Sequence, residues 1–181
     1  YTAILLMFFV HLLLLGLAKY NPITYIKKAF PVLSFAFTSR TSAGTLPLTV
    51  HALEKDFGIS KGIANLSASF GVSIGQNGCA GIYPAMLAVM IAPSVGVDPF
   101  TASFLVKLVI VTAIGSLGIA GVGGGATFAA LVVLSTMGLP VELVGLLIAI
   151  EPLIDMGRTA LNVNDAMVTA LLTARLQHKQ H

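Results

Sequence analysis

Apolar residues along the chain fall into segments of unequal length, separated by short polar breaks. The first segment, roughly residues 2–18, is just long enough to predict a helix that crosses a bilayer. The next two, residues 29–37 and 46–53, are too short to cross and flank the Ser/Thr/Gly-rich run 38–45. Two short helices around a polar tip predict a re-entrant hairpin, because an interrupted backbone is tolerated at membrane depth only where protein or a cavity surrounds it.

The same alternation recurs in the second half of the chain. A longer apolar segment over residues 61–92 is interrupted at 75–79, which predicts a broken transmembrane helix. Residues 104–114 and 127–137 then flank a glycine-rich run at 115–125, which predicts a second hairpin. Interrupted segments in corresponding positions of two halves are typical of secondary transporters and indicate where the substrate binds.

The pattern therefore predicts an all-α integral membrane protein with two oppositely oriented re-entrant helical hairpins, an inverted repeat. Lysine and arginine lie beside the first hairpin and in the C-terminal tail, but not in the loop 93–99. By the positive-inside rule, the first hairpin enters from the cytoplasm, the second enters from outside, and the C-terminus is cytoplasmic. The expected parts are a transmembrane helix (1–20), the first hairpin (21–60), the broken helix (61–92), the second hairpin (101–139), a substrate-binding transmembrane helix (140–175) and a cytoplasmic tail (176–181).

Composition agrees with a membrane protein. Hydrophobic residues make up 56% of the chain and charged residues 9%, whereas soluble domains contain about 25% charged residues. The net charge of +3 comes without a basic stripe interleaved with aromatic residues, so no nucleic-acid partner is expected. Cys79 is the only cysteine, which excludes an internal disulfide and a cysteine metal cluster. The chain begins at Tyr1 inside an apolar stretch, so we expect it to be a piece of a longer protein.

Three polar residues, Asp155, Arg158 and Asn162, interrupt the last apolar segment. A charge at the bilayer centre costs roughly 3 to 10 kcal/mol, so such residues face a polar cavity or a partner and usually carry function. Their spacing of i, i+3 and i+7 places them on one face of a helix. A carboxylate can bind an ammonium group and a guanidinium can bind a carboxylate, so this face predicts a buried amino-acid site, although a structural ion pair is the simpler alternative.

Other reactive groups do not form a recognisable constellation. His11 and His51 lie in apolar stretches without a partner histidine or acid at ligand spacing, so both are expected to be packing or interfacial residues. No nucleophile with a base and an orienting acid can be assembled from the sequence, and no enzymatic activity is expected.

Three motifs resemble a known family, the dicarboxylate/amino-acid:cation symporters, which include glutamate transporters. Residues 40–47 (RTSAGTLP) and 118–124 (GIAGVGG) are similar to the tips of the family's two hairpins. Residues 155–163 (DMGRTALNV) are similar to its final helix. The resemblance covers essentially the whole chain, as the C-terminal transport portion of such a protein. Within the family, the details look most like the bacterial L-cystine uptake symporters.

The resemblance implies roles for individual residues. Asp155 would bind the substrate's amino group, and Asn162 with Thr159 its main-chain carboxylate. Arg158 would bind a second carboxylate at the far end of the substrate. The hairpin tips and the broken helix would complete the substrate site with Thr41, Ser42, Cys79, Val122 and Gly123.

The expected coupling-ion site departs from the family pattern. Where the family has Asn-Met-Asp-Gly-Thr, this chain has Gly-Gln-Asn-Gly-Cys at 75–79, and the acid of the final helix falls one residue early. A hard cation prefers several oxygen ligands, commonly with a carboxylate, so both Na⁺ and H⁺ stay open as the coupling ion. The candidate coupling-ion residues are Gly75, Asn77, Glu151, Asn162 and Asp165.

The sequence thus predicts a secondary symporter that imports an amino acid, L-cystine first, by alternating access. The alternatives are an acidic amino-acid (glutamate or aspartate) or C4-dicarboxylate symporter, and a channel or structural membrane subunit. A dicarboxylate lacks the ammonium group that Asp155 would bind, which speaks against that substrate. By resemblance, we expect membrane lipid, N-terminal scaffold helices and two further copies in a homotrimer as partners, in a bacterial inner membrane, and no cofactor besides the coupling ion.

Overall fold

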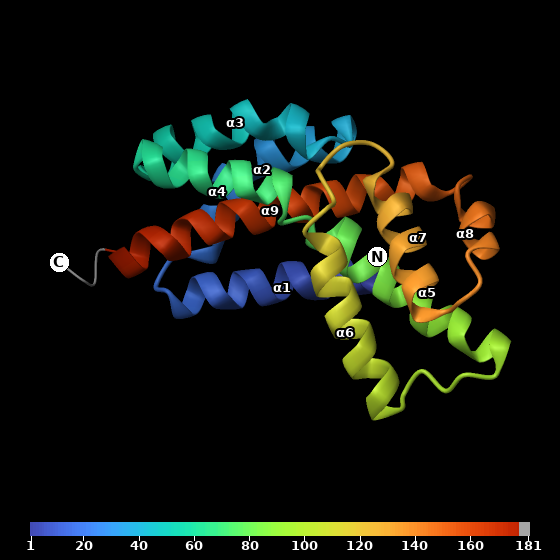
Figure 1. Ribbon diagram of the computed structural model, residues 1–181. Coiled ribbons are helices and arrows are strands. Elements are labelled where there is room, and N and C mark those ends of the chain that lie inside the picture. Colours follow the sequence, from blue (N-terminus) through green and yellow to red (C-terminus); the bar gives the residue numbers. More distant parts are fainter. Residues whose placement is uncertain (178–181) are drawn as a thin grey trace.

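The structure is a computed structural model that describes residues 1–177, and helices joined by turns and loops make up that range, without strands (Figure 1). Most of the predicted tail, residues 178–181, lies outside the described residues. The helices in chain order are α1 (Thr2–Leu17), α2 (Pro22–Ser39), α3 (Ser42–Lys55), α4 (Lys61–Ser73), the π-helix η1 (Asn77–Ile82), α5 (Tyr83–Ile91), the 3₁₀-helix η2 (Ala92–Val95), α6 (Ala102–Ser116), α7 (Gly125–Met137), α8 (Glu142–Leu147) and α9 (Glu151–Gln177).

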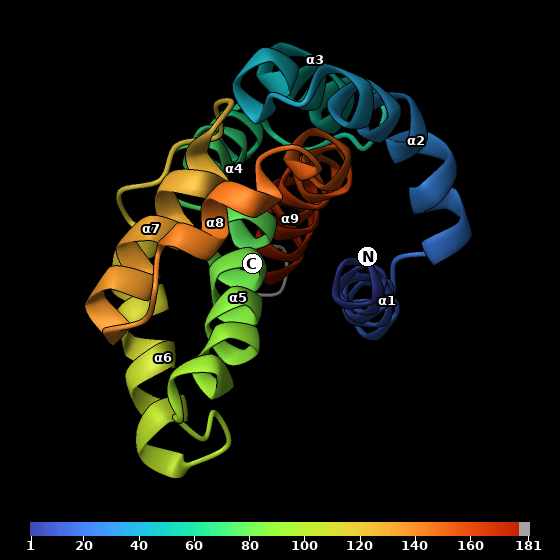
Figure 2. The same cartoon turned by 90° about the vertical axis from the view of Figure 1, so that its right-hand side faces the viewer.

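The long helix α9 is the central element of the fold. In Figure 1, α1 and α4 run beside it, α2 and α3 cover it, and α5 to α8 gather near its N-terminal end. One apolar core joins α1 to α4 with the C-terminal part of α9, and a second core joins α5, α6 and α7. Figure 2 shows the same two groups from the side, with α9 between α1 and α5. The two cores meet where η1 packs on α9.

The first predicted hairpin has the expected helix–turn–helix form. Asn21 caps α2 by accepting hydrogen bonds from the backbone N–H groups of Ile23 and Thr24. Arg40 ends α2 in the left-handed conformation, with φ of 56°. Thr41 then caps α3 by accepting from the N–H of Gly44 at 3.1 Å. One left-handed residue followed by one cap residue makes the tight turn at the hairpin tip.

The predicted broken helix is interrupted where expected. α4 ends at Ser73, and the chain resumes as η1 at Asn77, with Gly75 in the break. Taken together, Lys61–Val95 is the one helical segment, within the described residues, that is long and apolar enough to cross a membrane. The apolar helix α1 has 16 residues, about 24 Å, which is slightly shorter than a bilayer's hydrocarbon core. Its spanning role therefore stays a prediction.

The final segment differs from the continuous helix expected over 140–175. The structure divides it into the short α8 and the 27-residue α9, with a turn at 148–150. Pro152 lies in the first turn of α9. Proline is favoured in the first turn of a helix, because its missing N–H would have no helical partner there, and it is disfavoured in a helix interior, so Pro152 indicates that a helix begins near this position. The signal for this division was present in the sequence.

Candidate substrate-binding site

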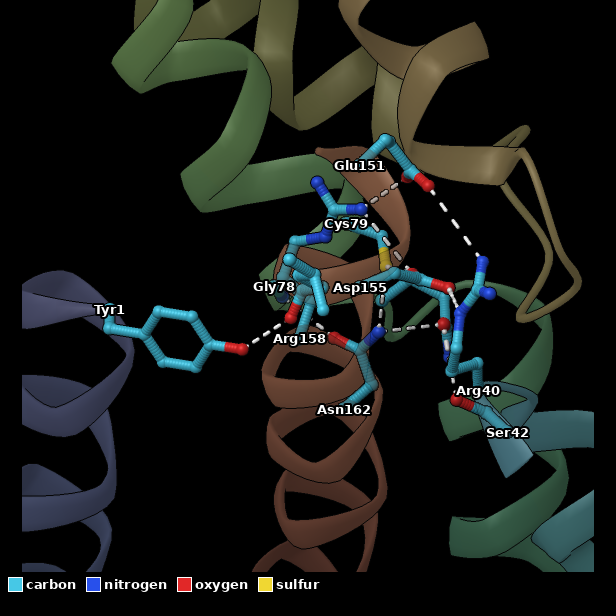
Figure 3. A network of polar contacts seen from close by, with 11 residues as sticks. Tyr1, Arg40, Ser42, Gly78, Cys79, Glu151, Asp155, Arg158 and Asn162 are labelled. Carbon is cyan, nitrogen blue, oxygen red and sulfur yellow. Dashed lines mark hydrogen bonds and ion pairs between the residues drawn. The ribbon is translucent and has the colours of Figure 1, made fainter. Parts of the chain in front are cut away.

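Three elements that lie far apart in the sequence converge at the N-terminal half of α9. The tip between α2 and α3 approaches from one side, and η1 packs against α9 from another (Figure 3). Together they enclose a network of charged and amide side chains. Its members on α9 are buried, and Arg158 is only 1% exposed.

Two arginines and two carboxylates form the charged part of the network. Arg158 Nη2 pairs with Glu151 Oε1 and lies 3.3 Å from Asp155 Oδ1. Arg40 Nε lies 3.3 Å from Asp155 Oδ2, and its Nη2 lies 4.0 Å from Glu151 Oε2. The four groups together carry no net charge. This balance allows Glu151, Asp155 and Arg158 to be buried beside the half-buried Arg40, because an unpaired charge away from water is very costly.

Arg158 keeps hydrogen-bonding capacity that the network does not use. Its Nε and Nη1 atoms are buried and have no hydrogen-bond partner among the described residues. Its guanidinium lies over the ring of Tyr83, 4.2 Å from the centroid, which stabilises the charge without using those donors. A guanidinium with free donors can bind a further carboxylate.

An amide network continues from these charges to the first hairpin. Asn162 Nδ2 donates to Gln76 Oε1 at 2.9 Å, and Asn162 Oδ1 accepts from the N–H of Gly78 at 2.7 Å. Ser42 Oγ donates to Gln76 Oε1 at 3.3 Å. Cys79 Sγ lies 3.1 Å from Asn162 Nδ2. Gln76 therefore links the hairpin tip to the polar face of α9.

The loop between α6 and α7 closes over the first hairpin through one glycine. The N–H of Gly121 donates to Val72 O at 2.8 Å, and its carbonyl accepts from the N–H of Ala43 at 3.1 Å. A Cβ at position 121 would lie 2.7 Å from Ser42 Cβ. The approach of the two loops thus requires glycine here.

Comparison with known proteins shows what this chain is similar to. Residues 1–176 match the family model of the sodium:dicarboxylate symporter family. The chain belongs to this family. It is 63% identical over 175 residues to the L-cystine uptake protein TcyP of Bacillus cereus, covering 97% of this chain and 38% of that protein. It is 64% identical over 179 residues to an uncharacterized symporter of Haemophilus influenzae, covering 99% of this chain and 41% of that protein.

The family assignment confirms the resemblance drawn from the three motifs. The chain spans about two fifths of the length of these symporter relatives. Symporters are transport proteins of membranes, so the family agrees with the expectation that the chain is membrane-embedded and is not an enzyme. The name of the family implies a coupling cation without showing which one.

The structure brings together most of the predicted substrate residues of this chain. Asp155, Arg158 and Asn162 lie on one face of α9, as their spacing predicts, with Ser42 and Cys79 beside them. Thr159 is buried next to Arg158. The remaining three lie apart from the polar network: Thr41 caps α3, Val122 is 56% exposed and Gly123 is exposed.

Arg40, Gln76 and Gly121 complete the network but were not singled out from the sequence. Arg40 carried a usable signal, because a charge at the tip of an apolar hairpin needs a buried partner. Gln76 sits in the break of the predicted broken helix, where unwound backbone is expected to line a site. Nothing local distinguishes Gly121 from its neighbours Gly118 and Gly123.

The candidate coupling-ion residues do not all gather into one cage: Gly75, Asn77 and Asp165 line one cavity, but Glu151 and Asn162 do not line it. Glu151 pairs with Arg158, whereas Asp165 lies 14 positions further along α9, about 21 Å along the helix axis. Asp165 is bound instead by His11, whose Nε2 lies 2.9 Å from Asp165 Oδ1. His11 was expected to be a packing or interfacial residue; it is buried between helices, and it also pairs with Asp165, because helix packing brings α1 against α9. An imidazole donor in place of an oxygen ligand does not suit sodium.

The amide of Asn162 offers a test of the network. Asn162→Asp would place a carboxylate oxygen against Gln76 Oε1, which cannot donate to it. We expect this substitution to destabilise the protein by about 2–4 kcal/mol and to lower substrate uptake. Thermal unfolding in detergent measures the first effect. The control is Asn21→Asp, which keeps the cap of α2; equal Tm changes in the two variants would contradict the network.

Proposed function

We propose that this chain forms the substrate-binding portion of a secondary symporter that imports L-cystine by alternating access. The observation that carries the proposal is the charge-balanced set of two arginines and two carboxylates, in which Arg158, Asp155 and Glu151 are buried and Arg40 is half-buried. Cystine carries an ammonium and a carboxylate at each end. A site with two cations and two anions offers each end one partner of each sign. The relative that is 63% identical is named L-cystine uptake protein, and this name supports the same substrate.

In this proposal, substrate binding exchanges partners within the network. Asp155 releases Arg40 and takes the ammonium group, and Arg158 uses its free donors for the distal carboxylate. Thr159 and Asn162 lie near the main-chain carboxylate. The re-entrant hairpins α2–α3 and α6–α7 close the site from two sides through residues 41–42 and 122–123, with Cys79 at its wall. Alternating access then moves this domain against scaffold helices, in a homotrimer in the bacterial inner membrane with a cytoplasmic C-terminus.

One alternative has specific support. The family description names dicarboxylates, and the free donors of Arg158 suit the side-chain carboxylate of aspartate or glutamate equally well. The presence of Glu151 as a second anion favours cystine, because an acidic amino acid has two carboxylates but only one ammonium group, which Asp155 would bind.

The test is uptake of labelled L-cystine by the full gene product in proteoliposomes, with sodium and proton gradients imposed separately. Concentrative uptake that unlabelled cystine blocks and aspartate does not would establish the substrate. Uptake of aspartate or glutamate in place of cystine would favour the alternative, an acidic amino-acid symporter. No uptake of any of them under either gradient would refute the transport proposal.

Asp155→Asn is expected to raise the cystine concentration needed for half-maximal uptake by about 100-fold. The amide keeps the shape of the carboxylate but loses its charge, and a buried charged hydrogen bond is worth about 3 kcal/mol. The control is Asp98→Asn, since Asp98 is exposed and its Oδ1 accepts from the N–H of Phe100. Unaltered affinity in Asp155→Asn would refute the role of Asp155.

A further inference from the structure

A second buried polar cluster lies outside the substrate network, between α1 and α9. Its centre is the pair of His11 and Asp165, whose side chains are 10% and 17% exposed. Asp165 is the only buried or half-buried acid of α9 that has no arginine or lysine partner among the described residues. The negative charge of Asp165 is therefore not neutralised by an arginine, whereas the carboxylates of the substrate network are.

The hydrogen bonds around His11 determine where its proton lies. Tyr25 Oη donates to Asn164 Oδ1 at 2.6 Å, because an amide oxygen can only accept. The amide nitrogen of Asn164 then faces His11 Nδ1 at 2.9 Å and donates to it. His11 Nδ1 carries no proton, so its Nε2 carries one and donates it to Asp165 Oδ1. The other carboxylate oxygen, Asp165 Oδ2, is buried and has no hydrogen-bond partner within residues 1–177.

Asp165 also lies where two cavities meet. A cavity of about 680 Å³ between α4 and α9 and one of about 750 Å³ among α1, η1, α6 and α9 are both lined by Asp165. His11 and Asp165 are the only ionisable side chains among the described residues that line either cavity. The other polar groups around the pair are neutral: Asn77 of η1, Thr112 and Ser116 of α6, Asn164 of α9 and, through Asn164, Tyr25 of α2.

The pair adjoins the substrate network. Asp165 follows Asn162 by three residues, and residues 75–77 line the same cavity as His11. Within that stretch, Gln76 bonds both to Asn162 and to Ser42 of the first hairpin. A change in charge at Asp165 thus acts beside the unwound segment that holds the substrate network together.

We propose that Asp165 is the binding site of the coupling proton and that His11 is its positioning residue. The inference rests on the proposed symport function. A proton from the water outside forms an O–H bond with Asp165 Oδ2 and leaves from the same atom to the inside, so the site alternates between one negative charge and none. His11 holds the other oxygen and excludes a metal cation, since its N–H would face that cation.

The decisive experiment compares driven uptake with exchange in proteoliposomes that contain the full gene product, using the substrate that the uptake assay identifies. A gradient of one pH unit should drive about tenfold accumulation by the wild type if one proton accompanies each substrate. Asp165→Asn, which mimics the protonated acid, should keep exchange of labelled for unlabelled substrate within about twofold and lose all accumulation. Asp98→Asn, at an exposed acid, should keep both activities.

Two variants of His11 test the positioning role. His11→Gln retains a donor to Asp165 and should keep driven uptake. His11→Leu removes that donor, which disfavours the charged carboxylate, so the pH for half-maximal uptake should move upward. His51→Gln on the exposed face of α3 is the matched control.

Three outcomes would overturn the proton site. One is proton-driven accumulation of substrate by Asp165→Asn at the wild-type level. Another is accumulation by the wild-type protein that a sodium gradient drives and a proton gradient does not. If Asp165→Asn does not fold, an unchanged pH profile in His11→Leu overturns the site. Each of these results leaves the proposed function standing, because the wild type still transports its substrate. Absence of any substrate exchange by the wild type would instead refute the proposed function.

Discussion

Arg158→Ala is expected to abolish uptake and to destabilise the folded protein by about 3–5 kcal/mol. The guanidinium is 1% exposed and is the partner of both Glu151 and Asp155. Its loss leaves Arg40 alone to balance two buried carboxylates, and an uncompensated buried charge costs far more than a lost surface ion pair. Uptake and thermal unfolding of the purified protein in detergent measure the two effects.

A double variant separates folding from substrate binding. Arg158→Met combined with Glu151→Gln removes one charge of each sign and leaves Arg40 paired with Asp155. Replacing a buried ion pair by neutral groups of similar volume is often close to neutral for stability. The double variant should therefore recover most of the lost stability but no uptake, since no group remains for the distal carboxylate. Normal cystine uptake by either variant would refute the assignment of Arg158.

Gly78→Ala is expected to have the second largest effect. A Cβ at this position would lie 2.9 Å from the carbonyl oxygen of Arg158 and 3.0 Å from its Cα. Both atoms belong to the backbone of α9, so η1 would have to move away. That movement would break the bond from the N–H of Gly78 to Asn162 Oδ1. Overpacking and a lost buried hydrogen bond together should cost about 2–5 kcal/mol and lower uptake at least about tenfold.

The control for this prediction is another glycine of a helix. A Cβ at Gly62 of α4 would meet no atom within 4 Å. Gly62→Ala should therefore stabilise the protein by about 0.5–1 kcal/mol, because alanine loses less backbone entropy in a helix. Comparison of the two Tm changes tests whether η1 and α9 are as closely packed as described. A Tm for Gly78→Ala equal to that of Gly62→Ala would contradict it.

The local elements of this chain could be predicted because their signals are local. The observed α1, Thr2–Leu17, is within one residue of the expected segment. Thr41 and the break near Gly75 lie where the polar runs indicated. Caps, turns and breaks depend on backbone hydrogen bonds between residues a few positions apart, so a short window of sequence contains what decides them. The split before α9 had such a signal in Pro152, because proline favours the first turn of a helix, and this signal was missed.

The partners of the buried charges could not be predicted in this way. Asp155 and Arg40 are 115 positions apart, and the links from α9 to Gln76 and to His11 span similar separations. Many acids and bases in the sequence would satisfy the same electrostatic requirement. Which of them pair depends on which helix faces pack together, and packing is a property of the whole fold.

The sequence by itself determined most of the helices, the break near Gly75, and the face of α9 that carries Asp155, Arg158 and Asn162, because helical periodicity is a local property of the backbone. The tertiary structure alone decided that Arg40 completes the substrate network and that His11 binds Asp165. The physical reason is that burial makes each of these charges costly unless a partner is present, and only the packing of distant helices supplies that partner.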